Sequence, residues 1–257
     1  MKARNLSISS LLVLVFLLNF PVQFLHEAAH WAVYQAYGRQ PVWGFTALVQ
    51  MWDKQPLHPE QWAAFTSPDG DQGWLRLASA PDSTFELFIS SAAGPLASLL
   101  IAVLGLLLSK RSRRPVAKYI TLGLSLVTSF VMTTYYLRSP LHTGGDEYYM
   151  AAQFSIPKLF IEIPLGLAFA ACLAFGLREL QGWRMRLTWL AALVVGGIPA
   201  AILISYADSA VRSQVDLGNP LFQSVIGFSL PVLLVPLAAL GGLWLWFVRM
   251  RAPVAFP

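Results

Sequence analysis

The stretch from Leu11 to Ala36 reads LLVLVFLLNFPVQFLHEAAHWAVYQA. Its first half is almost wholly apolar, and about 20 such residues in a helix are enough to cross the hydrocarbon core of a bilayer. Its second half holds His26, Glu27 and His30. An ionisable residue inside a membrane span is costly and by default marks a functional site. The stretch therefore predicts a membrane helix that carries chemistry.

The composition of the whole chain supports a membrane location. Of the 257 residues, 56% are hydrophobic and only 12% are charged, whereas soluble domains carry about 25% charged residues. The net charge is +5, but the basic residues do not form the cluster interleaved with aromatic residues that nucleic-acid binding requires. Cys172 is the single cysteine, which excludes a disulfide scaffold. We therefore expect the chain to lie in a lipid bilayer and not to bind nucleic acid.

Six stretches are long and apolar enough to span a membrane. They are Ser7–Tyr37, Phe85–Ser109, Val116–Leu137, Pro157–Leu177, Leu187–Ala207 and Leu221–Val248. Because they are continuous apolar runs and not short alternating segments, they predict helices and not barrel strands. No small-x-small cleavage site directly follows the first apolar run, so we expect this span to be retained. The predicted fold class is an all-α, multi-pass membrane protein with six transmembrane helices.

Lysine and arginine side chains alternate between the two sides of these spans. One side collects Lys2, Arg4, Lys110, Arg111, Arg113, Arg114, Lys118, Arg178, Arg184, Arg186, Arg249 and Arg251; the other has Arg39, Lys54, Arg76, Arg138, Lys158 and Arg212. Basic residues favour the cytoplasmic side of a membrane. The bias predicts that both termini are cytoplasmic, in the cell or inner membrane if the source is bacterial.

The polar segment of residues 38–84 separates the first two spans. Its part Val42–Trp52, VWGFTALVQMW, is rich in aromatic and β-branched residues and predicts a short strand or hairpin at the membrane interface. The rest, with Pro68-Asp69-Gly70, is typical of turns. We divide the chain into residues 1–155, with three spans and this loop, and residues 156–257, a C-terminal three-helix bundle.

The residues His26-Glu27-Ala28-Ala29-His30 form an H-E-x-x-H motif within the first span. The spacing of four places both imidazoles on one helix face, so both can reach one metal ion. Neutral imidazole suits Zn²⁺, which in catalytic sites lowers the pKa of water. Glu27 could take the proton from that water as the general base. The alternative is a polar helix face at the membrane edge, on which the histidines form hydrogen bonds with neighbouring residues.

A catalytic zinc usually has three protein ligands, and the stretch Leu141–Tyr148, LHTGGDEY, offers the third. The glycine pair Gly144-Gly145 lets the backbone turn tightly and could present Asp146 to the first helix. The first and third spans run the same way, so His26, His30 and Asp146 should arrive at the same depth, on the extracytoplasmic side.

Other donors for the third position stay open. His142 and Glu147 lie in the same stretch as Asp146 and are alternatives to it. His58 lies in the polar loop, where solvent exposure is its expected state, and Glu162 just inside the fourth span is expected to pair or to face a polar cavity.

With these residues the chain resembles the site-2 protease class of intramembrane zinc metalloproteases, the M50 peptidases, and especially their compact M50B-like branch. The resemblance rests on His26–His30, on Gly94-Pro95-Leu96-Ala97 in the second span and on Gly144-Gly145-Asp146. It covers about residues 1–155, the three-helix metalloprotease core of that family. It implies one zinc per chain held by His26, His30 and Asp146, with Glu27 as the catalytic base. It also implies short strands near the site that pair with an extended substrate, a role that Val42–Trp52 could fill.

The chain departs from the family pattern at several positions. Many members have Asn where this chain has Ser98, and Asp-Gly where it has Asp146-Glu147. Well-studied members also place the zinc toward the cytosol, opposite to the side that the charge bias predicts here. Near the site, Pro95 removes a backbone hydrogen bond of the second span, which predicts either a packing kink or a break beside the zinc that shapes the substrate path. We name His142 as a possible substrate or oxyanion contact.

The sequence therefore predicts a zinc metalloendopeptidase that hydrolyses peptide bonds of membrane-anchored protein substrates. The alternative is a non-proteolytic transporter or metal-binding regulator on the same scaffold. In that case Glu162, Pro164 and the broken fifth and sixth helices would line a pathway. The sequence does not indicate the substrate or the oligomeric state.

Overall fold

A computed structural model describes residues 7–39, 42–43, 48–49, 51–52, 60, 62–66, 72–217, 219 and 230–251. Its long helices are α1 (Ile8–Ala36), α2 (Thr84–Arg111), α3 (Pro115–Arg138), α5 (Leu159–Arg178), α6 (Trp183–Asp216) and α7 (Leu230–Arg251). The 3₁₀ turn η3 (Ser139–Leu141) and the short helix α4 (Asp146–Gln153) connect α3 to α5. The described part of the chain is thus mainly helical, as the composition predicts.

Five of the described helices are long and apolar enough to cross a membrane. These are α1, α2, α3, α5 and α6. The prediction of several membrane-spanning helices is thus supported for five of the six expected spans. The sixth expected span, Leu221–Val248, overlaps α7, in which the described apolar stretch is Val232–Val248. The first part of this span, residues 221–229, lies outside the described residues. A sixth crossing stays a prediction.

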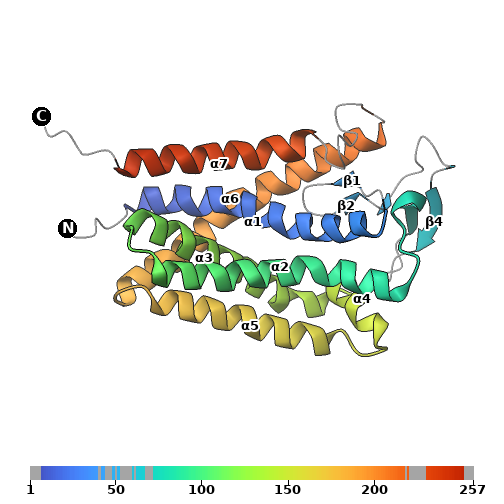
Figure 1. Ribbon diagram of the computed structural model, residues 1–257, viewed down its shortest axis with the longest axis horizontal. Helices are drawn as coiled ribbons and strands as arrows, with labels where there is room; N and C mark the ends of the chain where they lie inside the picture. Colours follow the sequence, from blue (N-terminus) through green and yellow to red (C-terminus); the bar gives the residue numbers. More distant parts are fainter. Residues whose placement is uncertain are drawn as a thin grey trace, which may run out of the picture.

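The long helices run alternately in opposite directions along one bundle (Figure 1). α1 begins and α7 ends at the same end of it, whereas α4 and the strands lie at the opposite end. Of the described basic residues, Lys110, Arg111, Arg113, Arg114, Lys118, Arg178, Arg184, Arg186, Arg249 and Arg251 fall at the first of these ends. The strand end has Arg39, Arg76, Arg138, Lys158 and Arg212. The orientation of the bundle in a membrane remains a prediction.

The apolar core joins helices from both sides of the expected boundary at residue 155. Leu14 of α1, Leu126 of α3 and Trp189 of α6 are fully buried in one cluster. At the strand end, Arg39 ties the end of α1 to the start of α2, because its guanidinium contacts Asp82 at 2.6 Å and Glu86 at 2.6 and 2.7 Å. These two helices supply most of the site described below.

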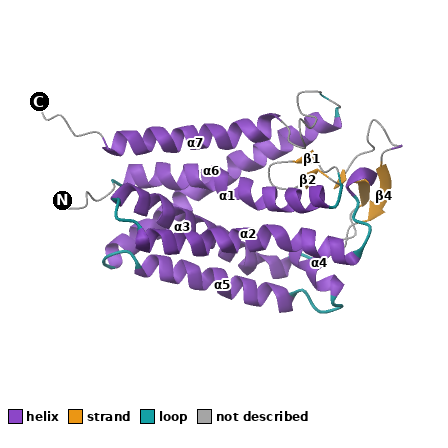
Figure 2. Cartoon of the chain, viewed as in Figure 1, coloured by secondary structure: helices purple, strands orange, loops and turns teal. Residues whose placement is uncertain are grey.

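Short strands fill part of the segment between α1 and α2 (Figure 2). β1 (Val42–Trp43) pairs antiparallel with β2 (Leu48–Val49), as expected for a hairpin within Val42–Trp52. β3 (Met51–Trp52), β5 (Gln72–Arg76) and β4 (Trp62–Thr66) form a second antiparallel sheet in that order. The interpretation of the later part of the loop as turns alone was wrong, because β4 and β5 flank Pro68-Asp69-Gly70 as a further strand pair.

The second helix is continuous, so of the two outcomes predicted for Pro95, a packing kink or a break, the break was wrong. α2 extends from Thr84 to Arg111 with Pro95 inside it. Pro95 removes one backbone hydrogen bond but leaves the rest of a helix that long intact. The small residues around it matter for another reason, which is how closely α2 approaches α1.

Candidate metal centre

His26 and His30 lie one turn apart on α1 and face the same point. Their Nε2 atoms are 3.2 Å apart, and their side chains are only 15% and 9% exposed. The α1 helix is continuous from Ile8 to Ala36 through Pro21, so the four-residue spacing is kept as helical geometry requires. The two imidazoles thus form one edge of a compact donor cluster.

Helix α2 fixes the orientation of both imidazoles from behind. The Nδ1 of His30 lies 2.6 Å from the backbone oxygen of Ser90, and the Nδ1 of His26 lies 2.9 Å from the Oγ of Ser98. Since a carbonyl oxygen only accepts, Nδ1 of His30 carries the proton and leaves its Nε2 lone pair free for a metal. Such outer contacts commonly hold the tautomer and orientation of metal-binding histidines.

Replacing Ser98 by Ala is expected to weaken zinc binding by about tenfold or more, because the contact that orients His26 is lost. Competition with a zinc-chelating dye on the detergent-solubilised chain measures the change. Ser109→Ala is the matched control, since Ser109 is also buried on α2 but donates to Leu106 of its own helix. Equal zinc affinity in S98A and wild type would contradict a role for Ser98.

Gly94 leaves room for the two imidazoles against α2. A Cβ at this position would lie 2.1 Å from Nε2 of His30 and 2.6 Å from Nε2 of His26. Both distances are far inside van der Waals contact, and the clash would fall on the two nitrogen atoms that face Asp146. Any other residue at position 94 would therefore fill the centre of the cluster.

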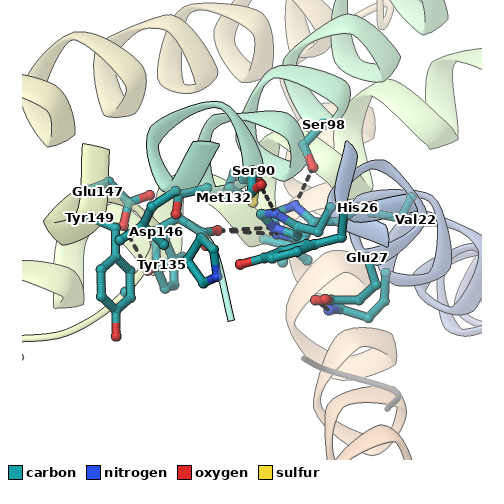
Figure 3. A pocket seen from close by; sticks show the side chains of 18 of the residues that line it. Val22, His26, Glu27, Ser90, Ser98, Met132, Tyr135, Asp146, Glu147 and Tyr149 are labelled. Atoms are coloured by element: carbon teal, nitrogen blue, oxygen red, sulfur yellow. Dashed lines mark hydrogen bonds and ion pairs between the residues drawn. The ribbon is translucent and has the colours of Figure 1, made fainter. Parts of the chain in front are cut away.

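Asp146 completes the cluster from a distant part of the chain. Its Oδ2 lies 3.6 Å from Nε2 of His26 and 3.2 Å from Nε2 of His30. It is the first residue of α4, and Gly145 before it has φ +102°, a left-handed conformation that favours glycine. A Cβ on Gly145 would also lie 2.7 Å from the hydroxyl of Tyr135. The glycine thus turns the chain so that the carboxylate faces the histidines (Figure 3).

The electrostatics separate Asp146 from its neighbour Glu147. Burial alone would raise the pKa of Asp146, but the nearby His30 and His26 outweigh it and hold that pKa well below its usual range. Burial, together with the charge of Asp146, raises the pKa of Glu147. Glu147 accepts a hydrogen bond from Tyr135 at 2.9 Å and lies outside the donor cluster. Of these two carboxyls, the geometry favours Asp146 as the ligand.

Glu27 lines the same cavity as the cluster. The cavity encloses about 680 Å³ and takes its wall from α1, α2, α3, α4, β4, β5 and α6. Glu27 is only 3% exposed, and Gln23 one turn earlier donates to its Oε1 at 3.0 Å. Two imidazoles, the Asp146 carboxylate and a further carboxyl thus line one cavity.

Other sequence candidates lie away from the cluster. His142 is exposed and lines a separate cavity of about 400 Å³ together with Gly144. Glu162 is buried against Lys158 and Ser139. His58 lies outside the described residues. In the part of the chain that the structure describes, the donor cluster is His26, His30 and Asp146.

Several residues of the site were not found from the sequence. Tyr135 and Ser90 belong to apolar spans and carry no motif. Arg212 of α6 lines the cavity and pairs with Asp208 at 2.8 Å. An Asp and an Arg four residues apart near the end of an apolar span were a visible signal, but the resemblance ended before α6.

The donor set fits a zinc ion. Around a tetrahedral zinc with ligands about 2.0–2.1 Å away, neighbouring donor atoms lie about 3.3 Å apart. The three separations here are 3.2, 3.2 and 3.6 Å. Two neutral imidazoles and one carboxylate are also a ligand set of catalytic zinc sites, which keep one position open. Comparisons of the chain with protein-family models, with curated proteins and with solved structures give no match.

Proposed function

We propose that the chain is a membrane-embedded zinc metalloendopeptidase of the site-2 protease kind. The observation that supports this most is the mutual spacing of His26, His30 and Asp146 at 3.2–3.6 Å. The proposal draws further support from Glu27, which lines the same cavity within a bundle of apolar helices. Membership of the M50 family and its M50B-like branch is part of the proposal.

In this proposal His26, His30 and Asp146 hold the ion, and Ser98 and the Ser90 carbonyl hold the imidazoles. The bound zinc would polarise the scissile carbonyl and lower the pKa of a water. Glu27 accepts the proton of the attacking water and then delivers it to the departing amine nitrogen. The hydrogen bond from Gln23 holds the orientation of the Glu27 carboxyl, and burial keeps this carboxyl poorly hydrated. His142 has no assigned part in this scheme.

The substrate is proposed to be a membrane-anchored protein. The cavity combines apolar residues such as Val131 and Met132 of α3 with Phe65 of β4 and Leu75 of β5. Since β4 lies at one edge of its sheet, an extended peptide in the cavity would lie beside strand backbone. From the charge bias we propose that this end of the bundle lies outside the cytoplasm and that both termini lie inside it.

Removal of zinc is expected to abolish hydrolysis of a membrane-anchored reporter by the purified chain, and stoichiometric Zn²⁺ is expected to restore it. The reason is that the imidazoles and Asp146 have no peptide-hydrolysing chemistry without the ion. Cleavage is followed by gel mobility and mass spectrometry of the fragments after treatment with phenanthroline. Hydrolysis that persists in verified zinc-free protein would contradict the proposal.

The transporter alternative receives less support. Its pathway was expected to use Glu162 and breaks in the fifth and sixth helices. Glu162 instead pairs with Lys158, while α6 continues through Pro199 and α7 through Pro236.

A further inference from the structure

Lys158 makes a concentrated set of contacts at the start of α5. Its Nζ lies 2.9, 2.5 and 3.2 Å from the backbone oxygens of Ser139, His142 and Gly144. The same ammonium lies 3.0 Å from Oε1 of Glu162. Its side chain is 13% exposed and that of Glu162 is 2% exposed. An ammonium has three protons to donate, so the three carbonyls and the carboxylate together use all of its hydrogen-bond donors.

These contacts act on the segment that delivers the acid of the candidate metal centre. Ser139, His142 and Gly144 span the connection from η3 to Gly145, and Asp146 follows directly. The Gly144 oxygen is only two residues before Asp146. Besides these Lys158 bonds, the connection has backbone bonds from His142 N to Ser139 O and from Tyr148 N to Gly145 O, and the Oγ of Ser139 contacts Glu162.

We infer that Lys158 is a positioning residue that sets the Asp146 carboxylate against His26 and His30. The inference rests on the proposed metal site. Glu162 fixes the ammonium by a buried ion pair, and the ammonium gathers three carbonyls of the connection into one arrangement. Loss of the ammonium would leave Glu162 buried without its cation. It would also remove the hydrogen bonds that hold the backbone next to Gly144 and Gly145. A ligand displaced by about 1 Å no longer matches the spacing that the other two donors require.

The test is zinc affinity of the full-length chain in detergent, measured by competition with a zinc-chelating dye. Lys158→Met keeps most of the side-chain volume and is expected to weaken zinc binding about 10- to 100-fold, the range seen for supporting residues of metal sites. Lys110→Met is the matched control, because Lys110 also pairs with a glutamate, Glu179 at 3.4 Å, but at the opposite end of the bundle. The K110M protein should bind zinc as wild type does.

A double-mutant cycle with Asp146→Asn separates positioning from a general loss of structure. If Lys158 acts through Asp146, adding K158M to D146N should change zinc affinity by less than about twofold. Equal zinc affinity of K158M and wild type, or the same fold-loss in both backgrounds, would overturn the inference. If K158M does not fold, Glu162→Gln takes its place, with a smaller loss expected and an unchanged affinity again overturning it. Absence of zinc binding by wild type would refute the proposed function itself.

Discussion

Replacing Glu27 by Gln is expected to slow peptide hydrolysis by about 10²–10⁴-fold, the usual contribution of a general acid–base group. Gln has the shape of Glu but cannot accept the proton of water. Its side-chain oxygen can still accept the bond from Gln23, which is 3.0 Å from Oε1 in the native chain. The local structure should therefore survive. The measurement is the single-turnover rate on a membrane-anchored reporter, with zinc content determined on the same sample.

The zinc content makes this variant decisive. Since Glu27 is not among the donors of the cluster, E27Q should bind zinc as tightly as wild type. Glu179→Gln is the control, because Glu179 pairs with Lys110 far from the cavity, and its rate should be unchanged. Undiminished hydrolysis by zinc-loaded E27Q would exclude Glu27 as the base.

Replacing Gly94 by Ala is expected to weaken zinc binding more than 100-fold and to abolish hydrolysis with it. The added methyl would lie 2.1 Å from Nε2 of His30, so either the imidazoles or α2 must move. The intrinsic helix propensity of Ala is better than that of Gly by about 1 kcal/mol. A loss of zinc binding in G94A would thus come from the clash and not from a weaker helix.

Gly197→Ala is a matched control for this effect. Gly197 also lies within an apolar helix, α6, but a Cβ there meets nothing within 4 Å. This variant should keep wild-type zinc affinity and show equal or slightly higher thermal stability. Near-native zinc affinity of G94A would mean that α2 does not approach the histidines as closely as the structure places it.

The parts of the site that the sequence predicts are those fixed by helical periodicity. A spacing of four residues puts His26 and His30 on one face whatever surrounds them. The meeting of these histidines with Asp146 follows from the number of spans between them, because alternating helices return the chain to the same end. Both inferences use only the regular geometry of helices, and the described structure places all three residues together.

The parts that were missed depend on tertiary contacts. The strands β4 and β5 are short and their residues are mixed in polarity, so only the Pro68-Asp69-Gly70 sequence between them gives a signal. The continuity of α2 through Pro95 is also not visible in the sequence, because a proline inside a helix can either kink the helix or end it. Lys158 was counted only as a loop charge, although its contacts lie 14 to 19 residues away along the chain. No local pattern contains such information.

The stoichiometry of zinc binding tests the central claim most directly. It is measured by elemental analysis of the purified full-length chain after zinc supplementation and removal of free metal. We expect one zinc per chain in wild type, and none retained when His26 and His30 are both replaced by Ala. A supplemented wild-type protein without stoichiometric zinc, or a double variant that retains as much zinc as wild type, would contradict the account.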